Sequence, residues 1–189
     1  MIELEILVKL NNIKVNEAKE VLLNFEQSKT SHIIDTYYFD PLRDKLSPDE
    51  NLRLNNSFRV RTINDNLSKL TYKLDKFDEE GKWLYSDEIE LKVSSSEDMK
   101  HILNHLGLEV LIIIDNSKTY FKHPEYEIVL EEVKNLGLFL EVELLNDISE
   151  DEAILKKKEI YKFIDSLGFK DFEEMDAGKP ELILKKTTS

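Results

Sequence analysis

Charged side chains of the same sign recur two residues apart along several segments of this chain. The carboxylate pairs are Glu3/Glu5, Glu88/Glu90 and Glu141/Glu143, and the cationic segments are Arg59/Arg61, Thr71/Lys73 and Lys118/Tyr120/Lys122. Residues two apart in a strand share one face of the sheet, where like charges repel. A face that served only stability would mix the two signs, so this pattern indicates chemistry on these faces.

The repulsion is relieved if the strands close into a barrel and the charged faces meet across a water-filled interior. Clustered carboxylates can hold Mg²⁺ or Mn²⁺ there, because both ions prefer oxygen ligands. Arg and Lys side chains can bind phosphate oxygens, and Arg can do so through two hydrogen bonds at once. A polyphosphate bridged by a divalent metal is the ligand that uses both signs together.

The spacing of apolar residues predicts the strands that carry these groups. Residues 2–10 alternate with period two, and Lys9 follows Glu3 and Glu5 on the polar face. Further strands are expected at 32–39, 57–63, 69–77, 84–93, 112–122, 126–133 and 138–145. Turn residues at 64–66 and 78–81 join the central three as two hairpins.

Helical spacing and capping residues predict helices at 17–27, from the cap at 94–97 to about 106, and at 151–167. A short helix is expected within the tail, 172–186. The sequence therefore predicts an α+β fold, a closed eight-stranded antiparallel β-barrel with flanking helices. We expect one domain over residues 1–189, with barrel strands at about 2–145 and a C-terminal helical part at about 150–189.

Composition limits the kinds of partner. The 189 residues carry a net charge of −13, which disfavours non-specific binding to nucleic acid or to an anionic membrane. The chain has no cysteine, which excludes disulfides and thiolate metal sites. No stretch approaches the roughly 20 apolar residues of a membrane span, and the first residues do not resemble a secretory leader. We expect a cytoplasmic protein with no nucleic-acid or membrane partner.

Several motifs resemble a known family in their order and spacing. They lie at 2–5, 35–40, 58–61, 70–73, 87–90, 130–133 and 136–143. This succession resembles the CYTH, or triphosphate tunnel metalloenzyme, family, which includes class IV adenylyl cyclases, thiamine triphosphatases and inorganic triphosphatases. The family opens on Glu-x-Glu-x-Lys. Its lysine position is Leu7 here, and Lys9 lies one step further along the same face.

The resemblance implies a triphosphate tunnel that uses Mg²⁺ or Mn²⁺, and it assigns roles by position. The implied metal-side carboxylates are Glu3, Glu5, Glu131, Glu141 and Glu143. The implied substrate-binding residues are Lys9, Arg59, Arg61, Lys73, Lys118 and Glu90. The implied catalytic residues are Glu5, Lys73 and Glu88.

Three functions remain open at the level of sequence. The first is a metal-dependent phosphohydrolase acting on tripolyphosphate, ATP, thiamine triphosphate or a similar compound. The second is a class IV adenylyl cyclase that converts ATP to cyclic AMP and pyrophosphate. The third is a polyphosphate- or nucleotide-binding module without catalysis, which the leucine at position 7 motivates. The sequence also leaves open whether the barrel forms a homodimer.

Overall fold

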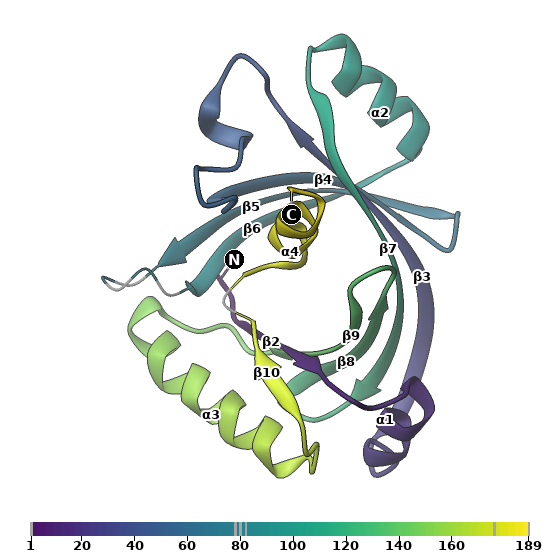
Figure 1. Ribbon diagram of the computed structural model, residues 1–189, viewed down its shortest axis with the longest axis vertical. Helices are drawn as coiled ribbons and strands as arrows, with labels where there is room; N and C mark the ends of the chain where they lie inside the picture. The colour runs from purple at the N-terminus through teal and green to yellow at the C-terminus, as the bar shows by residue number, and fades with distance from the viewer. Residues whose placement is uncertain (1, 78, 80, 82, 176, 189) are drawn as a thin grey trace.

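The computed structural model describes every residue except 1, 78, 80, 82, 176 and 189. Within these residues, strands form a single antiparallel sheet in the order β1-β6-β5-β4-β3-β7-β8-β9-β2-β10, and the sheet curls strongly (Figure 1). The strands are β1 (Ile2–Glu3), β2 (Glu5–Leu10), β3 (Glu26–Phe39), β4 (Asn56–Ile63), β5 (Leu67–Phe77), β6 (Trp83–Val93), β7 (Glu109–Lys122), β8 (Tyr126–Val133), β9 (Gly137–Leu144) and β10 (Phe172–Glu174).

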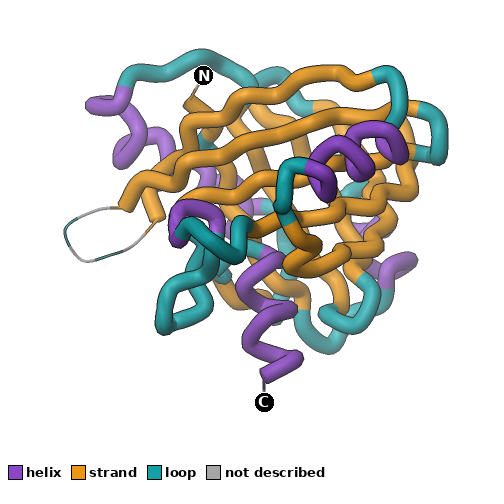
Figure 2. The backbone as a smooth tube through the Cα atoms, turned by 90° about the horizontal axis from the view of Figure 1, so that it is seen from above, coloured by secondary structure: helices purple, strands orange, loops and turns teal. Residues whose placement is uncertain are grey.

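Helices surround this sheet, and one enters it (Figures 1 and 2). The α-helices are α1 (Val15–Val21), α2 (Ser96–His105), α3 (Ala153–Ser166) and α4 (Lys179–Thr188), with 3₁₀ turns η1 (Asp44–Leu46) and η2 (Glu150–Glu152). The hydroxyl of Ser95 accepts a hydrogen bond from the backbone N–H of Asp98, which caps α2 as its sequence predicts. Part of the hairpin turn expected at 78–81 lies outside the described residues.

The two ends of the curled sheet meet at the N-terminal segment. There β1 pairs with β6, Glu3 lying opposite Ser86, whereas β2 pairs with β9, Glu5 lying opposite Glu143. Only Leu4 separates β1 from β2. The segment therefore bridges the open side of a half-barrel.

The antiparallel curled sheet and flanking helices confirm the predicted fold class, but the expected count of eight closed strands is wrong. The structure has ten strands among its described residues because the first expected strand divides at Leu4 and the tail adds β10. In a fully closed barrel, the free edge of β2 would pair with β6. Here β10 pairs with that edge instead, with Glu173 opposite Lys9. Among the described residues, β6 therefore pairs with the N-terminal segment through β1 and not through β2.

The main hydrophobic core lies outside the curl, between the sheet and the helices α1 and α3. Leu4, Ile6, Val8 and Leu10 of the N-terminal segment all point into it. Helical residues of the same core include Ala18, Leu22, Ala153, Ile160 and Ile164. Because successive strand residues face opposite ways, burying this apolar row outward directs the intervening residues, Glu3 and Glu5 among them, into the curl.

Helix α4 lies within the curl of the sheet rather than on its outer surface (Figure 1). Its residues Leu182 and Ile183 pack with a second core that contains Tyr37, Phe139 and the inward-facing Leu7. The apolar contacts of α4 thus occupy part of the interior. No helix in the described part of the chain combines the length and apolar character that a membrane crossing needs.

We expect the outer core to dominate stability. Ile160 of α3 is fully buried, whereas Ile154 of the same helix is 56% exposed. Ile160→Ala should therefore lower the free energy of unfolding by about 2–5 kcal/mol, because it removes buried methyl groups and leaves a cavity. Ile154→Ala should change it by about 0.5 kcal/mol or less. Urea unfolding followed by circular dichroism measures both, and equal losses would contradict this assignment of the core.

Candidate functional site

The interior of the curl holds a cavity of about 920 Å³. The residues predicted from the sequence that line it are Glu3, Glu5, Arg59, Arg61, Lys73, Glu88, Glu90, Lys118, Glu141 and Glu143. They come from β1, β2, β4, β5, β6, β7 and β9, which are spread over residues 2–144 of the chain. The structure therefore brings together in one enclosed space the charged faces that the sequence pattern singled out.

Two predicted residues do not line this cavity. Lys9 lies opposite Phe139, near the end of β2, and its side chain passes close to Gly137. Glu131 is fully buried, and its carboxylate contacts Lys118 and Lys179, which both line the cavity. Glu131 thus reaches the site through these two cations, whereas Lys9 stands apart from it.

The two arginines of β4 are held differently. Arg61 donates from Nε and one terminal nitrogen to the two oxygens of Asp35, at 2.7 and 2.8 Å, which is a bidentate pair across the β3–β4 ladder. Arg59 donates to the hydroxyl of Tyr37 at 3.0 Å, and its buried Nε has no hydrogen-bond partner. Arg59 therefore offers an unused donor to a ligand in the cavity.

Asp35 stays ionised beneath these arginines. Burial alone would raise its pKa, but the positive charges of Arg61 and Arg59 outweigh burial and hold the pKa well below its usual value. The carboxylate fixes the Arg61 guanidinium and neutralises one of two adjacent positive charges. Asp35 is thus a supporting residue of the site that the sequence assigned to a motif but to no role.

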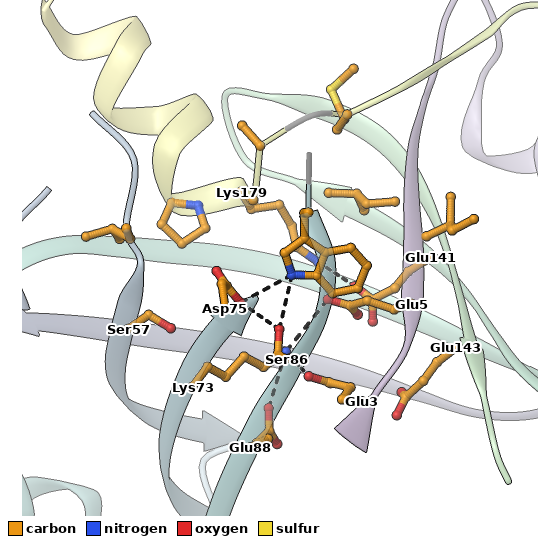
Figure 3. Close-up of a pocket in the computed structure, with 18 of the residues that line it drawn as sticks. Glu3, Glu5, Ser57, Lys73, Asp75, Ser86, Glu88, Glu141, Glu143 and Lys179 are labelled. Atoms are coloured by element: carbon orange, nitrogen blue, oxygen red, sulfur yellow. Dashed lines mark hydrogen bonds and ion pairs between the residues drawn. The ribbon is translucent and has the colours of Figure 1, made fainter. Parts of the chain in front are cut away.

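Lys73 lies at the centre of a group of carboxylates (Figure 3). Its Nζ contacts Glu3 and lies 3.2 Å from Glu88 and 3.7 Å from Glu5. Burial would lower the pKa of Lys73, but Glu5 and Glu3 outweigh it and raise the pKa well above its usual value. The ammonium group is therefore charged and links strands from both sides of the N-terminal bridge.

Lys73 does not neutralise all of the negative charge around it. Burial raises the pKa of Glu143 to about 8, with further contributions from Glu3, Glu5 and Glu141. Burial also raises the pKa of Glu5, against the opposing effect of Lys73. This part of the cavity carries a surplus of carboxylates over cations.

Next to this surplus, two residues further back along β9, lies a balanced cluster of two cations and two acids. Lys118 Nζ donates to Glu141 at 3.1 Å, and Lys179 Nζ donates to Glu141 at 2.6 Å and also to Glu131. Burial opposes ionisation of Glu141, but Lys118 and Lys179 outweigh it and hold its pKa well below the usual value. These buried ion pairs attach α4 to the wall of the sheet.

Lys179 is a residue that sequence reasoning missed. It is the first residue of α4 and lies 38 residues after Glu141 in the sequence. It lines the cavity because α4 enters the curl of the sheet. The glutamate Glu181 two residues later offered a weak signal, because its carboxylate caps this start by accepting the backbone N–H of Gly178 and also that of Leu54. A polar pair at a helix start is common, so it does not reveal burial.

The carboxylates suit a divalent metal in chemistry. Among the described residues, no three His, Asp or Glu side chains already converge as metal ligands. The donor set around Lys73 nevertheless consists of carboxylate oxygens, which Mg²⁺ and Mn²⁺ prefer. The raised pKa of Glu143 shows that added positive charge would be favourable there. Glu3, Glu5 and Glu143 are therefore the residues that fit a cation.

Comparison with known proteins shows the family of this chain. The CYTH domain matches residues 1–176. The chain belongs to the CYTH domain family. A protein of Methanocaldococcus jannaschii, MJ0240, provisionally named an adenylate cyclase, is 32% identical over 160 residues, which cover 83% of this chain and 85% of that protein.

Solved structures share the fold of this CYTH protein. The PH1819 protein from Pyrococcus horikoshii superposes with a TM-score of 0.79 at 27% identity, over 97% of this chain and 99% of that chain. A plant protein from Hippeastrum, HpAC1, superposes with a TM-score of 0.64 at 16% identity, over 100% and 97%. It is described as a provisional adenylyl cyclase with a dominant triphosphatase activity. One sequence relative and one structural neighbour of this chain thus carry names that refer to different reactions.

The ion pairs of Lys179 should be important for stability. Lys179→Met would leave Glu131 and Glu141 buried with one cation fewer, and we expect it to lower the free energy of unfolding by about 3–5 kcal/mol. Lys134→Met is the control, because its pair with Asp115 is exposed and should be worth about 1 kcal/mol or less. Urea unfolding measures both. Equal losses of unfolding free energy in the two variants would show that the buried ion pairs stabilise the fold no more than an exposed pair does.

Glu143 should make stability depend on pH. Its pKa rises from about 4.5 to about 8 on folding, so between these values the folded state keeps a proton that the unfolded chain releases. In EDTA, the melting temperature should therefore fall as the pH rises through this range, and it should fall less in Glu143→Gln. Exposed Glu132→Gln should follow the unmodified protein. Parallel profiles for Glu143→Gln and the unmodified protein would contradict the assignment.

Proposed function

We propose that this CYTH protein is a metal-dependent triphosphatase that hydrolyses inorganic triphosphate or an organic or nucleoside triphosphate in its charged cavity. One observation supports this most directly. The same enclosed space presents Arg59, Arg61 and Lys73 beside the surplus carboxylates around Glu5 and Glu143. A triphosphate accompanied by a divalent cation complements both sets of charges.

The cations would bind and orient the phosphates. Arg59 has a buried Nε without a partner, so a phosphate oxygen could accept this donor without breaking an existing hydrogen bond. Arg61 is held by Asp35 through two of its five N–H donors and lines the cavity, so its other donors would be available to a phosphate. Lys118 is buried and charged next to Glu141, and it would extend the same positive surface.

Glu3, Glu5 and Glu143 would hold Mg²⁺ or Mn²⁺, with Glu141 and the buried Glu131 supporting them through Lys118 and Lys179. When bound, the metal would polarise the transferred phosphoryl group and neutralise charge that develops on it. The carboxylates would also settle at lower pKa values beside the cation. This role would explain why the fold tolerates a surplus of acids.

The carboxylates near Lys73 would activate the attacking water and position Lys73. In the proposed reaction a water oxygen bonds to the terminal phosphorus while the bond from that phosphorus to the bridging oxygen breaks. Glu5 would take the proton from the water, and Lys73, which lies 3.7 Å from Glu5, would stabilise the negative charge on the leaving oxygen. Glu88 would hold Lys73 in place, since the two lie directly opposite in the β5–β6 ladder.

A second candidate is a class IV adenylyl cyclase. The cavity of about 920 Å³ lies near the upper end of the roughly 300–1,000 Å³ typical of small-molecule sites, so it has room for an organic group besides the phosphates. The relative MJ0240 also carries a provisional cyclase name. In that reaction a ribose hydroxyl attacks the α-phosphorus and pyrophosphate leaves. The same cations would serve either chemistry.

The two reactions differ in their products. With Mg²⁺ or Mn²⁺ we expect phosphate release from tripolyphosphate or another triphosphate and no cyclic AMP from ATP, and we expect EDTA to abolish turnover. Cyclic AMP as the main product would instead establish the cyclase. Tight, metal-dependent triphosphate binding without any product would identify a binding module.

Variants of the same assay test the site. Arg59→Ala and Glu5→Gln should each lower kcat/KM by about 100-fold or more, because each removes a group that acts on developing charge. Arg43→Ala is the control, since Arg43 lies outside the cavity and is largely exposed. Near-normal turnover in Arg59→Ala or Glu5→Gln would refute the proposed roles.

A further inference from the structure

One edge of β6 is unpaired over half of its length. Along its other edge β6 pairs with β5 from Trp83 to Val93. On the free side, β1 reaches only Ser86 and Asp87. Within the described residues no strand pairs with 88–93 on that side, so their backbone donors and acceptors form an open edge.

This open edge is also apolar on its outer face. Residues 89–92 are all exposed, and Ile89 and Leu91 expose 63% and 58% of their surfaces. An exposed strand edge beside apolar side chains is a template for pairing with another strand, and proteins usually protect such edges. The ladder with β1 stops at Asp87, and the exposed apolar residues begin at Ile89. The unpaired edge and the apolar residues therefore coincide, which indicates that another strand covers them.

We propose that this strand is β6 of a second copy of the chain, paired antiparallel about a two-fold axis at Leu91. In that register Leu91 meets the partner's Leu91, and Ile89 meets the partner's Val93 on the outer face. Glu90 meets the partner's Lys92 on the inner face, and the symmetry repeats this ion pair. The short segment is thus complementary to itself in both apolar contact and charge.

Neighbouring registers are less favourable. An axis at Glu90 would place two glutamates opposite each other, and an axis at Lys92 would place two lysines opposite each other. An axis between two residues would set inward-facing side chains against outward-facing ones, which the pleat does not allow. The charges therefore select the register centred on Leu91.

Glu90 already contacts Lys69 of the adjacent strand at 2.5 Å. Its carboxylate has two oxygens and can accept from Lys69 and from the partner's Lys92 together. Because Glu90 also lines the cavity, the pairing would bring the β6 sides of two cavities next to each other. The pairing itself does not depend on the reaction proposed above.

Sedimentation equilibrium of the full chain over a dilution series tests this directly. We expect a monomer–dimer equilibrium. Leu91→Lys places two ammonium groups at the axis and should weaken the dimer at least 10-fold. Ile113→Lys is the matched control, because Ile113 is 58% exposed on β7, and it should leave the dimer unchanged. A monomer at every concentration, or equal weakening by both variants, would overturn the proposal.

Charge exchange tests the register. Glu90→Lys and Lys92→Glu each set like charges opposite each other and should each give monomers. A mixture of these two variants should form a heterodimer, because both cross-strand pairs then join opposite charges. The double variant with both changes should dimerise again by itself. A dimer that persists in both single variants, or monomers in both the mixture and the double variant, would exclude this pairing.

Discussion

The interior of this protein is constrained by the cost of enclosing charge. A buried ion is stable only when an opposite charge or several hydrogen bonds compensate it. The curled sheet places acids and bases from distant strands on one inner surface, and most of them compensate one another there. Asp35 with Arg61, and Glu141 with Lys118 and Lys179, are two examples.

The balance of charge differs between two groups of residues in the cavity, and this difference bears on function. The wall around Glu141 has two lysines for two carboxylates, so it is stable without a ligand. The group around Lys73 has more acids than bases, and burial beside other carboxylates raises the pKa of Glu143 to about 8. A folded protein that keeps such a surplus gains from binding a cation, and a bound cation in turn suits an anionic substrate.

The same geometry inverts the usual position of the hydrophobic core. Apolar residues of the strands point outward beneath α1 and α3, while the interior is polar except where α4 enters it. Leu7 belongs to that apolar part and lies directly opposite Glu141 in the ladder. The position that is a lysine in the family therefore packs against α4 here, and Lys179 of α4 supplies a cation to the same glutamate.

The sequence by itself determined the faces of the strands. Alternation is a local property, so Glu3, Arg59, Lys73 and Glu141 could be placed on polar faces, and the like-charged pairs indicated an enclosed interior. Most strand and helix positions followed from the same periodicity and from caps such as Ser95, although the helix expected at 17–27 ends at Val21 and β3 begins at Glu26. The order of the motifs indicated the CYTH family.

Only the tertiary structure decided how these faces meet. The break at Leu4, the added strand β10 and the position of Lys179 depend on contacts between segments far apart in the chain. Burial could not be read from the sequence either, because an exposed and an enclosed glutamate have the same local pattern. Glu131 and Lys9 show this, since the family resemblance assigned both to the site, yet Glu131 is fully buried and neither residue lines the cavity. Pairwise charge compensation is a property of three-dimensional distance, which the spacing of residues along a strand does not fix.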